Sequence, residues 1–129
     1  MTTPEKSTPE QALLVMVHGS PRPSSNGDMF AVVEAVRARG VFSDVEVGFM
    51  ECNEPDIPTA IETLVSRGAT SVVAVPYFLH TGTHVADDLP TLLEEAQQKY
   101  PHIEFSMGDY LGHDELLGEV VALRAREIA

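Results

Sequence analysis

The chain has 129 residues, a length typical of one domain rather than two. Hydrophobic residues make up 43% and charged residues 22%, which is enough to build a core and excludes disorder beyond the first residues. Eight Lys and Arg against 20 Asp and Glu give a net charge of −12. Nucleic acids and anionic membrane surfaces bind basic patches, so neither is expected as a partner.

The N-terminal residues 1–11 (MTTPEKSTPEQ) are polar and contain proline. We expect them to form a flexible tail ahead of a folded domain over 12–129. They lack the apolar stretch of a secretory signal, and the longest apolar run, Ala12 to Val17, is too short to span a bilayer. The single cysteine, Cys52, cannot form an internal disulfide. Together these features predict a cytoplasmic protein.

The first predicted strand, over 12–17, is apolar at every position, which is typical of a strand buried on both faces. It ends at His18-Gly19-Ser20. Residues 21–27 are rich in turn formers and predict a loop. A helix is expected after this loop, closing at Gly40.

The middle of the chain repeats the alternation of strand and helix. Residues 45–49 alternate between apolar and polar, which predicts a half-exposed edge strand. Asp56 stands where a helix N-cap belongs, with Pro58 in the first turn and Gly68 at the end. Residues 71–75 then form a second apolar strand, which belongs in the centre of a sheet.

The last third of the chain predicts a third and a fourth helix. The third follows His84 and must have Pro90 in its first turn, where proline is tolerated. Residues 103–106 alternate like a second edge strand. The fourth helix is expected to open at 112–114 and to carry an apolar face.

Strands that alternate with helices predict an α/β fold, here a four-stranded parallel sheet with helices on both faces. Two central and two edge strands, joined by right-handed crossovers, give the strand order 2-1-3-4. Ligands bind such sheets at the carboxyl ends of the strands where the order reverses. His18 follows the first of these strands, His80 and His84 follow the third, and Glu51 ends the second strand beside them. The sequence therefore predicts a site at this edge.

Imidazoles are common neutral ligands of divalent transition metals, so the histidines with Glu51 suggest an open site with N and O ligands. The paired cysteines of a structural zinc site are missing. Each candidate also has a simpler interpretation as a loop, pocket-wall or solvated residue. Asp87 and Asp88 are interpreted as helix-start charges rather than as metal ligands.

Four motifs taken together carry a resemblance: His18-Gly19-Ser20, Glu51, residues 76–90 (PYFLHTGTHVADDLP) and Leu111-Gly112-His113. With these motifs the chain resembles the small, single-domain sirohydrochlorin chelatases of the CbiX type, which are class II tetrapyrrole chelatases. The resemblance runs from about residue 12 to residue 126. It implies a flavodoxin-like domain similar to one half of the longer bacterial chelatases.

The resemblance implies a lyase that inserts a divalent metal into sirohydrochlorin, with Co²⁺ as first choice and Fe²⁺ or Ni²⁺ as alternatives. The pathways implied are those to cobalamin, siroheme or coenzyme F430. His18 and His84 correspond to the two active-site histidines of the family, the metal is a substrate, and no organic cofactor is implied. Short members of the family work as symmetric homodimers. One histidine, or Glu51, would accept the pyrrole protons, and activity is expected to fail below about pH 6, where free imidazole is protonated.

The remaining assignments follow from position beside this site. His80 is expected as an additional metal ligand. The expected substrate-binding residues are Ser20, Arg22, Tyr77, Phe78, Leu79 and Gly82. The chain departs from the family at Pro21, which separates His-Gly-Ser from Arg22, and at Thr83, where a basic residue is common. Two other functions stay open: a non-catalytic carrier or regulator that binds metal or tetrapyrrole, and a flavodoxin-like module for a flavin or nucleotide.

Overall fold

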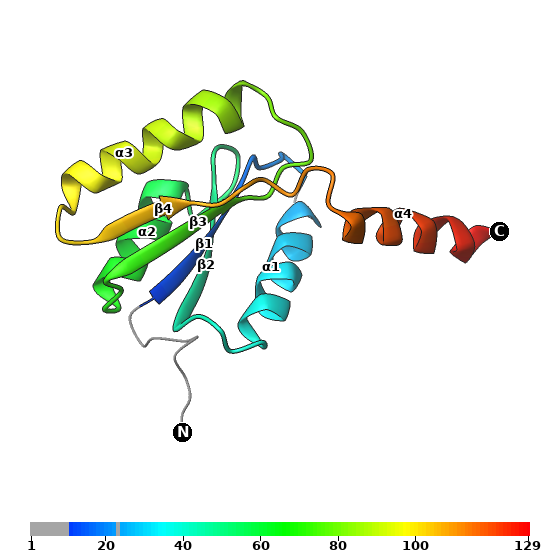
Figure 1. Ribbon diagram of the computed structural model, residues 1–129, viewed down its shortest axis with the longest axis horizontal. Helices are drawn as coiled ribbons and strands as arrows, with labels where there is room; N and C mark the ends of the chain where they lie inside the picture. The colour runs from blue at the N-terminus through cyan, green and yellow to red at the C-terminus, as the bar shows by residue number, and fades with distance from the viewer. Residues whose placement is uncertain (1–10, 23) are drawn as a thin grey trace.

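Strands and helices alternate along the chain (Figure 1). The structure, a computed structural model, describes residues 11–22 and 24–129, so most of the expected tail lies outside the described residues. The elements in chain order are β1 (Gln11–Val17), α1 (Ser24–Arg37), β2 (Asp44–Phe49), α2 (Ile57–Ser66), β3 (Ser71–Pro76), the π-helical turn η1 (His84–Asp88), α3 (Leu89–Lys99), β4 (Glu104–Met107) and α4 (Glu115–Ile128).

The four strands form one parallel sheet in the order β2-β1-β3-β4, which confirms the predicted fold. Residues 12–17 of β1 are all buried, because both faces of this central strand are covered. Its alternate side chains divide the core into two clusters. Leu14 and Met16 pack with α2 and α3, whereas Leu13 and Val15 pack with α1. Helices therefore cover both faces of the sheet.

Local signals set the limits of α2 as predicted. The Asp56 carboxylate accepts a hydrogen bond of 2.9 Å from the amide of Thr59, which makes it the N-cap, and Pro58 stands in the first turn. The helix ends at Ser66, and Gly68 follows with a φ of 104°. That conformation favours glycine, so the chain can leave the helix without strain there.

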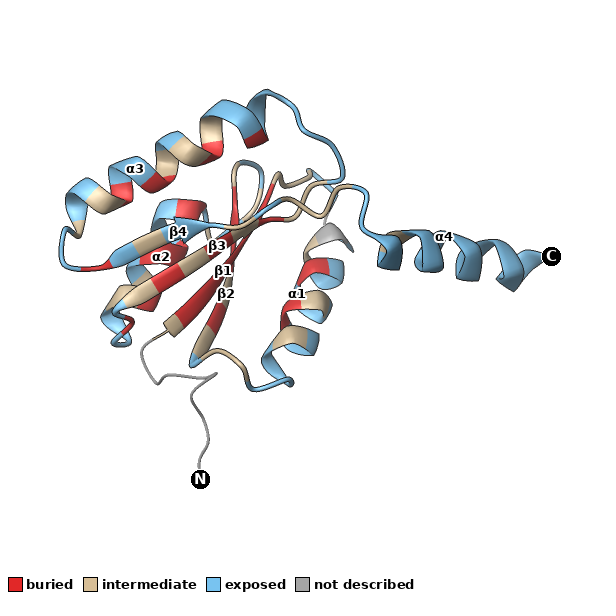
Figure 2. Cartoon of the chain, viewed as in Figure 1, coloured by how far each residue is buried: buried red, intermediate tan, exposed pale blue. Residues whose placement is uncertain are grey.

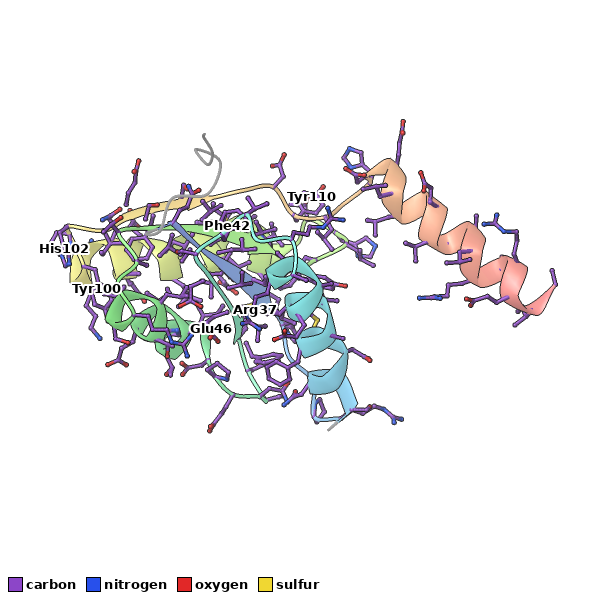
Figure 3. All side chains as sticks on the ribbon, turned by 90° about the horizontal axis from the view of Figure 1, so that it is seen from below. Arg37, Phe42, Glu46, Tyr100, His102 and Tyr110 are labelled. Carbon is purple, nitrogen blue, oxygen red and sulfur yellow. The ribbon has the colours of Figure 1, made fainter. Side chains whose placement is uncertain are left out.

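Helix α1 begins earlier than the sequence predicts. The expected loop over 21–27 is wrong in its second half, because α1 already starts at Ser24. Residues 24–27 are poor helix formers, but Met29 and Val33 are buried against the sheet and hold the helix by packing. At its other end Arg37 donates to the Glu34 carboxylate and to the Val45 carbonyl, which ties α1 to the edge strand (Figure 3).

Strand β3 is central, as predicted, but is buried on one face only. Val72 and Ala74 are buried among α2 and α3, whereas Val73 and Val75 on the other face are half-buried. Helix α4 does not cover that face. It extends away from the sheet, and none of its residues is buried (Figures 1 and 2).

Within residues 11–22 and 24–129, no helix combines the length and the apolar character that a membrane crossing requires.

Candidate functional site

The candidate site lies at the carboxyl ends of β1, β2 and β3. The parallel pairing continues beyond the strands, since the amide of Glu51 donates to the carbonyl of His18 at 3.1 Å. On the other side the amide of Tyr77 donates to the carbonyl of Met16 at 2.8 Å. These bonds carry the three chain segments side by side into the loops. His18 and Glu51 are thereby neighbours across the sheet edge, as predicted.

Gly19 and Asn53 fix the two loops against each other. Gly19 has a φ of 101°, and a Cβ atom there would lie 1.9 Å from the carbonyl oxygen of Glu51. Only glycine allows this approach. Asn53 holds the two loops together. Its side-chain oxygen accepts from the backbone amide of Ser20 at 2.8 Å, and its backbone amide donates to the carbonyl of Glu51 at 2.8 Å. The backbone under His18 and Glu51 is therefore held by both loops.

His18 offers one nitrogen to the site. Its Nδ1 lies 3.1 Å from the carbonyl oxygen of Gly19, and since a carbonyl only accepts, Nδ1 carries the hydrogen. In the neutral ring Nε2 then bears a lone pair, and it lies 3.2 Å from Oε2 of Glu51. Two atoms that both offer electron pairs at this distance need a proton or a metal cation between them. A metal ion bonded to both atoms at about 2.1 Å would have an N–metal–O angle of about 100°, which suits adjacent ligands.

His84 is oriented by a carboxylate. It begins the π-helical turn η1, in which the amide of Leu89 donates to the carbonyl of His84. In this turn Nδ1 of His84 lies 2.7 Å from Oδ2 of Asp88. A carboxylate only accepts, so Nδ1 donates, and in the neutral ring Nε2 then bears the lone pair. A carboxylate behind a histidine is the usual means of fixing the tautomer of a metal ligand.

The two imidazoles face each other across the sheet edge. The ring centroids of His18 and His84 are 4.9 Å apart and the rings are inclined by 48°. The side chains of His18 and His84 are 44% and 46% exposed, so a ligand can reach them from solvent. The arrangement places two imidazoles side by side, each within reach of a carboxylate. It can bind a divalent cation and accept protons.

The structure does not assemble the expected ligand set of three histidines. Within residues 11–22 and 24–129, no group of three or more His, Cys, Asp or Glu side chains is arranged to hold a metal ion. His80 is exposed in the segment between β3 and η1. Its expected role as an additional metal ligand stays a prediction.

The expected substrate-binding residues differ in their exposure to solvent. Tyr77 and Phe78 are half-buried and pack against the α1-side and the α2/α3-side clusters, respectively. Leu79 is 56% exposed. Arg22 is exposed, and its amide donates to the Ser20 hydroxyl at 3.2 Å. The aromatic pair therefore forms the support of the site, whereas Leu79 and Arg22 are open to a ligand.

Asp88 is the residue that the sequence analysis underrated. It was interpreted as a helix-start charge, but its carboxylate is bonded to His84. The spacing of four residues between a histidine and an aspartate was the available signal. The pairing did not follow from the prediction that the third helix begins after His84, whereas His84 itself begins a helical turn.

Comparison with known proteins agrees with this arrangement. The CbiX family model matches residues 12–128. The chain belongs to the CbiX family. It is 36% identical over 121 residues to the sirohydrochlorin cobaltochelatase of Saccharolobus solfataricus, with 89% of this chain and 93% of that protein covered. It is 32% identical over 119 residues to the sirohydrochlorin ferrochelatase of Bacillus subtilis, with 92% and 46% covered.

Among solved structures, the chain is similar to the sirohydrochlorin chelatase SirB from Bacillus subtilis subspecies spizizenii, determined in complex with cobalt. The TM-score is 0.87 at 34% identity, and the match covers 93% of this chain and 51% of SirB. The CbiX chain described here therefore spans about half the length of the two Bacillus proteins and nearly all of the Saccharolobus one.

Proposed function

We propose that this CbiX-family chain is a sirohydrochlorin chelatase, which inserts a divalent metal ion into the macrocycle. The observation that carries the proposal is the pair of neighbouring imidazoles at an open sheet edge, with Asp88 behind His84 and with Glu51 beside Nε2 of His18. The relatives named as cobaltochelatase and ferrochelatase support the same reaction. The metal ion is a substrate of this reaction and leaves with the product.

The two histidines would hold the incoming metal by Nε2. Both Nδ1 atoms are engaged, with Gly19 and with Asp88, which leaves Nε2 of each ring as the nitrogen for a metal, and the ring centroids lie 4.9 Å apart. Binding there removes water from the metal before it meets the macrocycle. Because the ligands stand on braced loops, the metal is presented in a fixed position, and positioning is the main contribution of the protein.

The carboxylates, together with the histidines, would accept the protons that the macrocycle releases. A divalent metal that enters sirohydrochlorin displaces two pyrrole protons, so two acceptors are required for each turnover. Glu51 lies 3.2 Å from His18 and Asp88 lies 2.7 Å from His84. Each pair of histidine and carboxylate can take one proton as the metal leaves its nitrogen. Both side-chain pairs reach solvent and can release the protons afterwards.

The choice of metal is part of the proposal. We propose Co²⁺ first, with Fe²⁺ and Ni²⁺ as alternatives, because imidazole and carboxylate ligands accept all three ions. The Saccharolobus relative is named for cobalt and the Bacillus relative for iron. Affinity alone rises along the series from iron to nickel, so the rate of insertion has to decide.

A carrier that binds metal or tetrapyrrole without insertion is the second candidate. It is favoured by the charge of the loops after β1 and β3, residues 18–22 and 77–83, in which Arg22 is the single Lys or Arg. Sirohydrochlorin carries many carboxylates, which a basic side chain binds best. A site with one arginine would hold this substrate less firmly than a site with several.

One experiment separates the two candidates. Sirohydrochlorin is mixed anaerobically with Co²⁺, Fe²⁺ or Ni²⁺, and absorbance is followed with the protein, with the His84→Ala variant and without protein. A chelatase accelerates insertion, and His84→Ala removes the acceleration. A spectral shift on binding without acceleration for any metal would contradict the chelatase and favour the carrier. The absence of any shift would contradict sirohydrochlorin as the ligand of either candidate.

A further inference from the structure

Helices α2 and α3 begin with nearly the same four residues, DIPT at 56–59 and DLPT at 88–91, but the chain enters the two helices differently. Asp56 is extended, with φ −74° and ψ 171°, and its carboxylate caps α2. Asp88 is helical, with φ −72° and ψ −44°, and makes no capping hydrogen bond. The chain is already helical from Thr83 onward. The proline of the first motif therefore stands at a helix start, whereas that of the second lies inside a helical segment.

Pro90 is incompatible with a regular α-helical turn before it. The ring of a proline collides with the carbonyl four residues earlier, and proline has no amide to donate to that carbonyl. For Pro90 the carbonyl belongs to Ala86, which lies in η1. For Pro58 it belongs to Glu54, which lies before α2, so no conflict arises there. A helix that passes through Pro90 has to change its register.

The turn before Pro90 shows this change of register. The amide of Leu89 donates to the carbonyl of His84, five residues back, where an α-helix would use the carbonyl of Val85. A π-helical turn of this kind takes up one residue more than an α-helical turn. Prolines and π-helical turns are both recognised causes of local distortion in helices, and here they are adjacent in the chain.

The wider turn determines the side of the helix on which His84 lies. Leu89 is fully buried and marks the side of α3 that faces the sheet. With 3.6 residues per turn, a side chain five residues before Leu89 in an α-helix would point about 140° away from it. The π-helical bond instead places His84 one turn from Leu89, on nearly the same side. His84 is thereby kept beside His18, with the ring centroids 4.9 Å apart.

We propose that Pro90 is a positioning residue of the site, which keeps His84 beside His18 by excluding the α-helical register from η1. The ring of Pro90 lines the groove between α3 and β4 together with Phe105 and Met107, so its effect on the site passes through the backbone of η1. The importance of this position for metal binding rests on the proposed function. The geometry itself can be tested without metal.

The first test measures the proximity of the two rings in the metal-free protein. Nuclear Overhauser contacts between the ring protons of His18 and His84 are recorded for the wild type, Pro90→Ala and Pro90→Gln. Both variants restore an amide that can bond the Ala86 carbonyl, so we expect the contacts to be lost. Pro58→Ala removes proline from the same position of α2 and should keep them.

Urea unfolding of the same proteins separates a change of register from a loss of fold. Proline is the poorest helix former, so the Pro90 variants should be at least as stable as the wild type. Ring contacts that persist in either variant would overturn the proposal. A Pro90 variant that does not fold would overturn it too, because the α-helical register would then not be available to η1.

Titration with Co²⁺ alone measures the consequence for the site. We expect Pro90→Ala to weaken Co²⁺ binding about 10- to 100-fold, as the loss of other supports of ligating histidines does, and Pro58→Ala to bind like the wild type. Adding Pro90→Ala to His84→Ala should cause no further loss, because Pro90 acts through His84. A further loss in the double variant would contradict this route. A wild type that binds Co²⁺ without inserting it would refute the proposed function and leave the positioning intact.

Discussion

The imidazole ring of His18, which follows β1, lies 4.9 Å from that of His84, which follows β3, between ring centroids. This juxtaposition results from the strand order, because β1 and β3 are neighbours and their carboxyl ends meet at the point where the order reverses. The two rings therefore lie close together although the loops that carry them are far apart in the sequence. The chemistry that we propose depends on this single meeting point.

The bond between His84 and Asp88 predicts that Asp88→Asn impairs metal insertion while the fold is kept. The amide can present its nitrogen to Nδ1 and so favour the wrong tautomer, which removes the lone pair from Nε2. A loss of about 10- to 100-fold in metal affinity or turnover is expected, as for other carboxylates behind ligating histidines. Insertion rates and metal titrations measure it.

Asp87→Asn is the matched control for that change. Asp87 is the exposed neighbour of Asp88, and its backbone carbonyl rather than its side chain accepts the bond from Thr91. Equal losses for both variants would show that charge at the helix start, and not the bond to His84, determines the effect.

The close approach at Gly19 predicts a large loss of stability for Gly19→Ala. The added Cβ would lie 1.9 Å from the carbonyl oxygen of Glu51, and the φ of 101° is unfavourable for alanine. We expect the free energy of unfolding in urea to fall by at least about 2 kcal/mol, because backbone must move to relieve the overlap.

Gly27→Ala in α1 is the contrasting substitution. A Cβ at Gly27 meets nothing within 4 Å, so this variant should be as stable as the wild type or gain up to about 1 kcal/mol from helix propensity. If Gly19→Ala were equally harmless, the brace between the two site loops would not exist as described.

The N-cap of α2 predicts a contribution to stability that depends on pH. Hydrogen bonds from the side chain and the amide of Thr59 hold the pKa of Asp56 below its usual value of 3.8. A lowered pKa in the folded state means that the contribution is present above the unfolded-state value and disappears as pH falls through the folded-state value. Asp56→Ala should cost about 1 kcal/mol at neutral pH and less near pH 3.

Urea unfolding of the wild type, Asp56→Ala and Asp56→Asn at both pH values measures this. Asparagine keeps the acceptor but does not titrate, so its difference from alanine should persist in acid. A cost of Asp56→Ala that does not shrink at low pH would contradict the ionised cap.

The sequence is sufficient to predict the sheet and its order, because residues 12–17 of β1 are all apolar and the two edge strands alternate. It also locates the ends of α2, where Asp56, Pro58 and Gly68 are strong local signals. The early start of α1 could not be predicted, since Ser24 and its neighbours are turn formers and the helix depends on packing of Met29 against the sheet.

The site is predictable in its main residues but not in its details. His18, Glu51 and His84 follow strand ends, so the topology brings them to one edge. The bond between His84 and Asp88 depends on a π-helical turn, which the hydrophobic periodicity of the chain does not predict. The direction of α4 could not be predicted from the sequence either, because an amphipathic pattern predicts an apolar face but not the surface that this face covers.

The rate of metal insertion in a variant that lacks both imidazoles tests the central claim most directly. His18→Ala with His84→Ala is compared with the wild type under anaerobic conditions, using sirohydrochlorin and Co²⁺, and His102→Ala is the control. His102 is exposed at the opposite end of the sheet (Figure 3). We expect insertion by the double variant to fall to the rate without protein, while the control keeps the wild-type rate. Insertion at the wild-type rate by the double variant would contradict it.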